Sequence, residues 1–183
     1  LKGHMQFGLH NYFSASSEYI TFLRNPIERI ISYYYVKKSP WHHFYRLNLF
    51  NDDMSLYDFV TEINFPIGNK FQKKSLYYPI IDINNGQTRL ISGIQDKEEL
   101  MLEKALENIK QHYSFVGAIE KFNESLIILQ KMYGWTLTNY KIKNKNDDRK
   151  KIEEIDRKTI DAIKYFNAAD IALYEKMNST LKN

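Results

Sequence analysis

The sequence contains no cysteine among its 183 residues. This absence excludes a disulfide framework and thiolate chemistry, and it is compatible with a reducing compartment. Long apolar runs are also missing, because no stretch approaches the ~20 residues that a membrane-spanning helix needs. The first residues, LKGHMQFGLH, lack the basic start and long apolar centre of a signal peptide. We therefore expect no membrane segment and a cytoplasmic location, with a membrane-anchored parent protein as the alternative.

The composition is that of a globular protein, with 43% hydrophobic and 26% charged residues. We expect one domain over residues 1–183 with a core of its own. The net charge of +4 favours anionic partners. Much of this charge lies in residues 141–151, KIKNKNDDRKK. Two aspartates interrupt this run, and it contains no aromatic residue. We therefore interpret residues 141–155 as a solvated basic linker and expect no nucleic-acid partner.

A strand, a tight turn and a helix are predicted between residues 19 and 35. The run 19–23 is aromatic and β-branched, which is typical of a parallel strand buried on both faces. Asn25 is a good N-cap, Pro26 suits the first helical position and Glu28 completes a capping box. An apolar stripe on the helix is formed by Ile27, Ile30, Ile31 and Tyr34.

The second half of the chain repeats this alternation. Residues 97–113 predict an amphipathic helix, 114–120 a second buried strand, and 122–134 a helix with Asn123 as N-cap and Gly134 as its stop. The tail predicts two helices, with Asn167 capping the second and Asp170 three residues further on. The fold class is therefore α/β, a parallel sheet flanked by helices. Residues 36–95 form an irregular excursion, with one short helix near 54–63.

Polar side chains gather where the first strand ends. Arg24 follows the strand, and Asn25, Arg29 and Ser32 share one face of the helix that begins there. Ligands of open α/β sheets bind beyond the carboxyl ends of the strands, and a helix N-terminus favours anions. The arrangement suits a phosphate group; the alternative is an arginine that braces the helix against a carboxylate, with Ser32 in solvent.

Six motifs follow one another in a distinctive order. They are Gly3-His4, LRNPIERIISYYY at 23–35, QTRLISG at 87–93, FVG at 115–117, EKF at 120–122 and NAADIALY at 167–174. This series resembles the carbohydrate sulfotransferases related to heparan sulfate 2-O-sulfotransferase, whose pattern is a GH pair, a strand and then RxPxxRxxSxY. The resemblance spans nearly the whole chain and implies a P-loop-NTPase-like sulfotransferase fold. It also implies transfer of a sulfuryl group from 3′-phosphoadenosine 5′-phosphosulfate (PAPS) to a hydroxyl on a glycan.

The resemblance gives the candidate residues roles. Arg24 and Ser32 would bind the 3′-phosphate of PAPS, with Arg29 and Asn25 beside them. His4 would be the catalytic base, since sulfuryl transfer to an alcohol needs a proton acceptor that titrates near neutral pH. The alternative is that His4 is an ordinary polar residue at the end of a strand or loop.

Further candidates lie outside this motif. The residues Gln87, Thr88 and Arg89 would line the donor or acceptor cleft, or else stabilise their loop. His10 is a further candidate for the acceptor side, with a positional role as its alternative. The pair His42-His43 invites a metal-site interpretation, but adjacent residues rarely bind one ion and no carboxylate cluster accompanies them. We therefore expect no metal.

One element of that family has no counterpart in the sequence. The family holds the 5′-phosphosulfate with a P-loop-like turn upstream of the GH pair, whereas this sequence starts two residues before Gly3, and its Gly-Asn-Lys at 68–70 lacks flanking glycines. We therefore expect an N-terminally incomplete sulfotransferase fold, either a fragment of a longer protein or a chain without half of the donor site.

Two further functions are weighed against the transferase. A non-catalytic module that binds anions or glycans on a degenerate sulfotransferase-like fold is the main alternative. Phosphoryl transfer is disfavoured, because neither a Walker-type lysine loop nor a Mg²⁺-binding carboxylate is evident.

Overall fold

The computed structural model describes residues 3, 5–37, 53–64, 83–95, 97–136 and 148–180. The chain divides into two compact units, each discontinuous in sequence. The first unit contains Leu1–Asn25, Asn85–Tyr140 and Ala169–Asn183, and the second contains Pro26–Asn84 and Lys141–Ala168.

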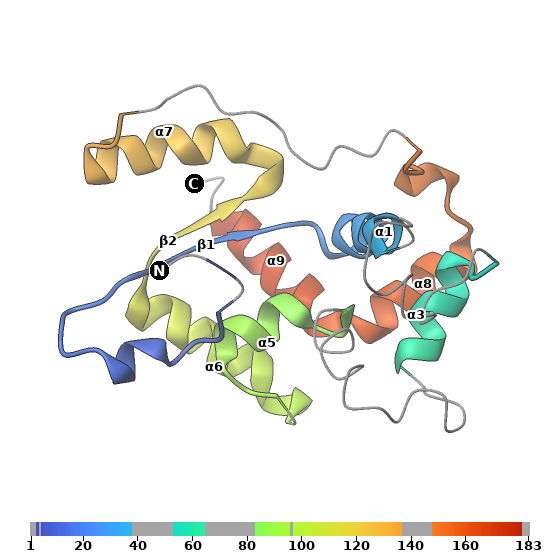
Figure 1. The fold of residues 1–183 in the computed structure, drawn as a ribbon, viewed down its shortest axis with the longest axis horizontal. Coiled ribbons are helices and arrows are strands. Elements are labelled where there is room, and N and C mark those ends of the chain that lie inside the picture. The colour runs from blue at the N-terminus through green and yellow to red at the C-terminus, as the bar shows by residue number, and fades with distance from the viewer. Residues whose placement is uncertain are drawn as a thin grey trace. The chain divides into compact units, whose positions relative to one another are not determined.

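A parallel strand pair is the centre of the first unit (Figure 1). Strand β1 (Tyr19–Leu23) pairs with β2 (Tyr113–Ala118), in a register that sets Leu23 opposite Ala118. The two predicted strands and their parallel direction are thereby confirmed, but the second strand ends at Ala118 and not at residue 120, because a 3-10 turn begins at Ile119. Because the strands are parallel, both carboxyl ends lie at one edge of the pair.

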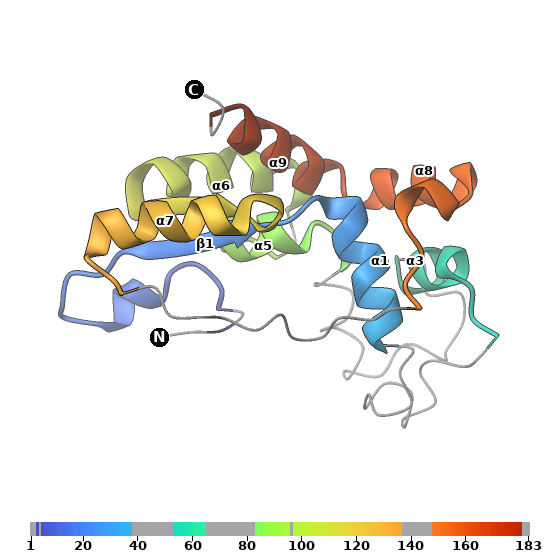
Figure 2. The same cartoon turned by 90° about the horizontal axis from the view of Figure 1, so that it is seen from above.

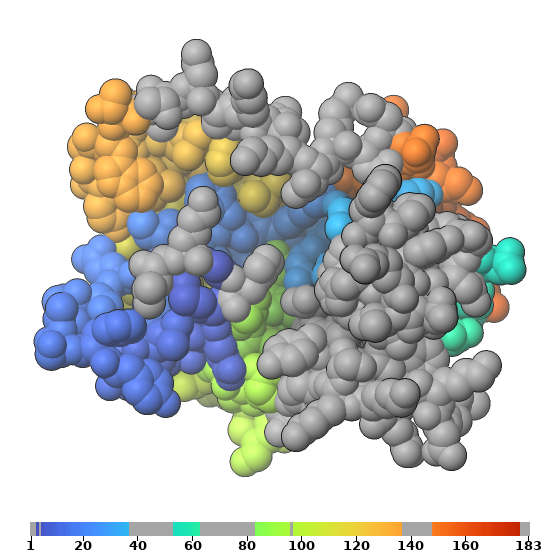
Figure 3. Space-filling view, viewed as in Figure 1, coloured from blue at the N-terminus to red at the C-terminus, as the bar shows by residue number. Residues whose placement is uncertain are grey.

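Helices lie on both sides of this strand pair. Helix α7 (Phe122–Tyr133) lies on one side, and α5 (Gly86–Ser92), α6 (Glu98–His112) and α9 (Ala168–Thr180) lie on the other (Figures 1 and 2). Short 3-10 turns, η1 (Leu9–Tyr12) and η3 (Ile119–Lys121), precede β1 and α7. The segment before β1 lies on the surface in the space-filling view, and Tyr12 within it is 84% exposed (Figure 3).

The core of the first unit lies between the strands and the helices α5, α6 and α9. Its buried members are Leu23, Ile91, Ala105 and Leu173. Leu102, Leu106 and Ile109 of α6 pack against them, which confirms the predicted amphipathic helix. The burial of β1 on both faces was predicted wrongly: among its five residues only Leu23 is buried. Aromatic side chains from β1, β2 and α7 contact one another, with the Phe22 ring 5.9 Å from Phe115 and 5.3 Å from Phe122 between centroids.

The second unit is helical in its described residues. It contains α1 (Pro26–Lys37), α3 (Leu56–Asn64), the 3-10 turn η4 (Ile152–Glu154) and α8 (Arg157–Phe166). Helix α1 begins at Pro26 as predicted. Three residues of its stripe, Ile30, Ile31 and Tyr34, are buried in a second core, and the partly buried Ile27 packs against it. The other buried members of this core are Met54, Phe59, Val60, Ile83, Ile163 and Phe166. The expected short helix near 54–63 is therefore confirmed as α3.

One predicted cap is wrong, and at a second, Asn167, which directly precedes α9, a distant side chain accepts the helix N–H groups. Helix α7 begins at Phe122, so Asn123 lies inside the helix and Lys121 is the N-cap residue; Gly134 ends the helix with φ 65°, as predicted. In α9, the Asn85 side chain accepts the hydrogen bonds of the first N–H groups, those of Ala169 and Asp170. The amide of Asn167 instead donates to the carbonyl of Ile163. A distant side chain has taken the role that the sequence assigns to a local one.

The fold class is thus mixed α/β, mostly helical with a small parallel sheet in the described residues. The P-loop-like fold stays a prediction, and so does the assignment of a single domain. The prediction that residues 36–95 are irregular was wrong near their end, where α5 is a regular helix. No helix within the described ranges has the length and apolar character needed to cross a membrane.

Candidate functional site

Arg24 and Asn25 lie directly after the carboxyl end of β1 and are both partly buried. Helix α1 follows them in the chain. At the neighbouring end of β2, the 3-10 turn η3 brings Glu120 to the same edge of the strand pair. The structure therefore confirms the predicted position of Arg24 at a strand end, where ligands of parallel sheets bind.

The backbone of Arg24 is held by one side chain. The Arg24 N–H donates to Oε1 of Gln87 (2.8 Å), and Nε2 of Gln87 donates to the Arg24 carbonyl (3.0 Å). Gln87 is only 8% exposed. The Gln87 amide thus binds both backbone groups of Arg24, the N–H and the carbonyl, as a neighbouring strand would.

A buried carboxylate holds Gln87 in turn. Oδ2 of Asp170 accepts from the Gln87 N–H (3.2 Å), and Oδ1 accepts from both the N–H and the hydroxyl of Thr88 (2.7 Å each). Asp170 and Thr88 are 1% and 0% exposed. Since Asn85 accepts from the first N–H groups of α9, the helices α5 and α9 cap each other's N-termini.

Glu120 holds the next peptide. Its Oε1 accepts from the Asn25 N–H (2.7 Å), and its Oε2 accepts from the Tyr174 hydroxyl (3.1 Å). The sequence did not predict this acceptor for the Asn25 N–H. Burial, together with the charge and hydrogen bond of Glu120, raises the pKa of Tyr174 to about 12. The tyrosine therefore stays protonated at neutral pH and donates to the carboxylate.

The predicted cleft residues of α5 have partners inside the first unit. Arg89 is 6% exposed, forms an ion pair with Glu98 (2.6 Å) and donates to the carbonyl of Gln95. Thr88 is bound to Asp170 as described above. These contacts favour the stabilising alternative for Thr88 and Arg89, whereas Gln87 contacts the turn that carries Arg24. A direct substrate role for the three residues stays a prediction.

His10 lies at the opposite end of β1. Its Nδ1 is 2.8 Å from the hydroxyl of Tyr19, the first residue of the strand, and its ring is 4.9 Å from His112 between centroids. The length of the strand separates His10 from Arg24. This position favours the positional role that was the alternative for His10.

The other candidates lie elsewhere. Arg29 and Ser32 are partly buried on α1 and belong to the second unit. Their convergence with Arg24 stays a prediction. His4, the pair His42-His43 and the basic residues 141–147 lie outside the described residues.

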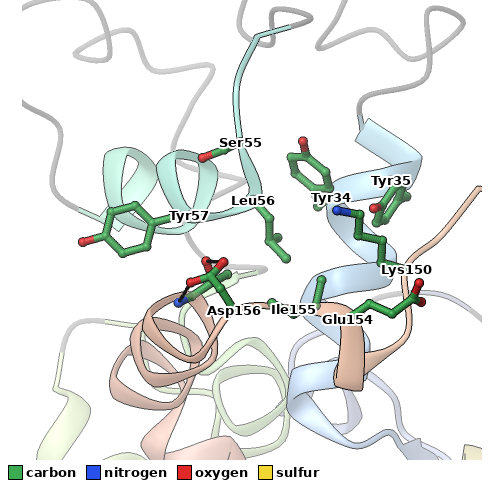
Figure 4. Close-up of a pocket in the computed structure, with 10 residues that line it drawn as sticks. Tyr34, Tyr35, Ser55, Leu56, Tyr57, Lys150, Glu154, Ile155 and Asp156 are labelled. Carbon is green, nitrogen blue, oxygen red and sulfur yellow. Dashed lines mark hydrogen bonds between the residues drawn. The ribbon is translucent and has the colours of Figure 1, made fainter.

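A pocket of about 240 Å³ lies in the second unit, lined by side chains from α1, α3 and the segment that leads into α8 (Figure 4). Several of its polar groups already bind protein partners. Asp156 accepts from the N–H and the hydroxyl of Thr159, and the Tyr34 hydroxyl donates to the Met54 carbonyl. The pocket shares no residue with the predicted donor site. In the ranges that the structure describes, no group of three or more histidine or carboxylate side chains could hold a metal ion.

The side chains that hold the backbone of Arg24 and Asn25 were not predicted from the sequence. Glu120 and Asp170 both stand in motifs of the family resemblance, but their partners are far away in the chain. A local signal existed for Asn85, because Asn-Gly pairs favour turns and Asn85 adopts φ 51°. Its role as a cap for α9 had no signal in the sequence.

The chain matches one family model over residues 1–183, that of Galactose-3-O-sulfotransferase. No curated protein and no solved structure matches the chain significantly. The match confirms the carbohydrate sulfotransferase part of the resemblance. A relation to heparan sulfate 2-O-sulfotransferase stays a prediction.

Proposed function

Because the chain belongs to the galactose-3-O-sulfotransferase family, it is a sulfotransferase that acts on carbohydrate, and we propose that Arg24 and Ser32 hold its sulfuryl donor. The family implies PAPS as this donor. Membership favours the transferase over the non-catalytic anion-binding module. The observation that carries the proposal is the position of Arg24, beyond the carboxyl end of β1 on a backbone that two side chains hold.

The proposed roles are those that the family resemblance implies, and they suit the negative charge of the donor. The guanidinium of Arg24 and the hydroxyl of Ser32 bind the 3′-phosphate, with Asn25 and Arg29 beside them. The acceptor oxygen attacks the sulfur, the bond between sulfur and the 5′-phosphate oxygen breaks, and adenosine 3′,5′-bisphosphate leaves. His4 takes the proton of the acceptor hydroxyl, which increases the nucleophilicity of the oxygen. The role of His4 rests on the resemblance of the Gly3-His4 pair.

We further propose the 3-hydroxyl of galactose as the acceptor, from the family's description. A β-galactoside carrying a methyl group on O3 would then not be sulfated, whereas the same sugar methylated on O6 would be. Sulfation of the 3-O-methyl sugar would contradict this assignment. His4→Ala should lower kcat on the unmodified galactoside while the affinity for adenosine 3′,5′-bisphosphate stays unchanged.

The donor site is tested by calorimetric titration with adenosine 3′,5′-bisphosphate. Arg24→Ala should weaken binding about 10- to 100-fold, the effect of losing a charge-assisted hydrogen bond. Arg157→Ala is the matched control, because Arg157 lies on α8 with its side chain 95% exposed. Equal affinities of wild type and Arg24→Ala would refute the donor role of Arg24.

A further inference from the structure

The side-chain amide of Gln87 binds both the backbone N–H and the backbone carbonyl of Arg24, which lies 63 positions away in the chain. The backbone N–H and C=O of Arg24 would otherwise have to be satisfied by a strand or by water. Two simultaneous hydrogen bonds restrict both backbone dihedral angles of Arg24. The direction in which its side chain leaves the backbone therefore depends on Gln87.

Further hydrogen bonds hold the first turn of α5, which carries Gln87. Gln87 lies in the first turn of α5, where the buried carboxylate of Asp170 accepts from its N–H and from the N–H of Thr88. Asn85 and Asp170 join α5 to α9 by reciprocal caps. The amide of Gln87 is thus presented from two helices that fix each other, rather than from a flexible loop.

The N–H of the following residue, Asn25, is held from the 3-10 turn η3 after β2. Glu120, just beyond β2, accepts from the Asn25 N–H and is itself bound by Tyr174 of α9. Arg24 and Asn25 are consequently restrained at consecutive N–H groups. Such a restraint lowers the conformational entropy that a flexible arginine turn would lose on binding an anion.

We infer that Gln87 is a positioning residue for the sulfuryl donor, acting through the backbone of Arg24. This inference rests on the proposed function, because it assigns Gln87 a task only if Arg24 binds the donor. Gln87 does not need to contact the donor. Its effect is to orient the Arg24 guanidinium before the donor arrives.

The test is a double-mutant cycle of Gln87→Met and Arg24→Ala in the full chain, with adenosine 3′,5′-bisphosphate as the probe. Gln87→Met keeps the volume of the side chain and removes both hydrogen bonds. It should weaken binding about 3- to 10-fold in the wild-type background, which corresponds to the loss of a neutral hydrogen bond. In the Arg24→Ala background it should change the affinity less than about twofold, because the group that it positions is absent.

Kinetics give a second readout. Gln87→Met should raise KM for PAPS while KM for the galactoside acceptor stays constant. Gln111→Met is the control, since Gln111 is an exposed glutamine on α6 whose amide donates to the surface carboxylate of Glu107. A general loosening of the fold would instead change both KM values.

A third variant covers the case in which Gln87→Met does not fold. Gln87→Glu has the same shape and exchanges only the donating Nε2 for an oxygen that faces the Arg24 carbonyl. Its affinity relative to wild type should recover as the pH falls, because the protonated carboxyl can donate to that carbonyl again.

The outcomes separate this inference from the proposed function. If Arg24→Ala leaves binding unchanged, the donor role of Arg24 fails and the inference fails with it. If Arg24→Ala weakens binding but the Gln87 substitutions have no effect, or add their full effect to that of Arg24→Ala, the donor site stands and the positioning role is refuted.

Discussion

Asp170 is a buried carboxylate that accepts three hydrogen bonds at the start of α5. Replacing it by asparagine would set an NH₂ group against a backbone N–H, so that at least one buried donor loses its acceptor. We expect Asp170→Asn to lower the free energy of unfolding by about 2–3 kcal/mol, measured by urea denaturation. Asp161→Asn is the control, because Asp161 lies in an exposed ion pair on α8. Equal losses in the two variants would contradict the structural importance of Asp170.

Two partly buried tyrosines, Tyr174 and Tyr113, should make the stability of the protein fall at alkaline pH. Burial, followed by the charge and hydrogen bond of Glu120, raises the pKa of Tyr174 to about 12, and burial, followed by the charge of Tyr19, also raises the pKa of Tyr113. Tyrosine in an unfolded chain titrates near pH ~10. The folded state therefore binds these protons more tightly, and this contribution to stability is complete below pH ~10 and is lost as the pH rises through about 12.

The measurement is the midpoint of denaturant unfolding between about pH 9 and about pH 12. Tyr174→Phe should reduce the decline of the midpoint in this range, because phenylalanine has no proton to lose. Tyr165→Phe, at a side chain that is 73% exposed, should leave the decline as in wild type. Identical profiles for all three proteins would show that Tyr174 does not contribute.

At the scale of elements, strand β2 contains a glycine that its neighbours require. A Cβ on Gly117 would lie 2.8 Å from ring atoms of both Phe115 and Phe22. Because these rings contact each other and Phe22 also packs on Phe122 of α7, neither can move without disturbing the strand pair. We expect Gly117→Ala to destabilise the protein by about 1–3 kcal/mol, the usual cost of overpacking, as measured by thermal unfolding.

Gly134 provides the comparison for this prediction. It ends α7 with φ 65°, and a Cβ added to it would have no atom within 4 Å, so that alanine there meets backbone strain without a steric clash. If overpacking dominates at Gly117, then Gly117→Ala combined with Phe22→Leu should recover part of the lost stability, whereas Gly134→Ala with Phe22→Leu should not. Failure of this rescue would contradict the packing explanation.

The elements of this protein were largely predictable from local sequence. Asn25-Pro26 marks the start of α1 and Gly134 the end of α7, and the apolar stripes of α1 and α6 have helical spacing. Parallel pairing followed from the alternation of strands and helices. The exposure of β1 did not follow, because the composition of a strand does not state how completely its neighbours cover it.

The site was predictable only where its residues are neighbours in sequence. Arg24 and Asn25 stand at a strand end that the pattern reveals. Their hydrogen-bonding partners, Gln87 and Glu120, are 63 and 95 residues away. A side chain that binds a distant backbone group leaves no periodicity or spacing in the sequence, and for the same reason the cap of α9 was assigned to Asn167 instead of Asn85.

At the scale of the whole molecule, each unit has a core of its own, although the chain enters and leaves both units repeatedly. Leu173→Ala creates a cavity in the first core and Ile163→Ala in the second, and each should cost about 2–5 kcal/mol. Hydrogen exchange should show where protection is lost first: in the amides of β1 and α6 for Leu173→Ala, and in those of α1 and α3 for Ile163→Ala. The same exchange pattern from both variants would show that the two cores unfold as one.

The reciprocal caps of α5 and α9 have a consequence for the order in which the protein is made. A ribosome releases β1, Arg24 and Gln87 well before Asp170, which is 83 residues after Gln87 and holds it. Domains fold during synthesis from the N-terminal side. Gln87, which binds the Arg24 backbone, is itself held by Asp170 only when α9 has emerged. If Arg24 binds the donor as proposed, a nascent chain stalled before Asp170 should contain this arginine but bind adenosine 3′,5′-bisphosphate more weakly than the finished chain.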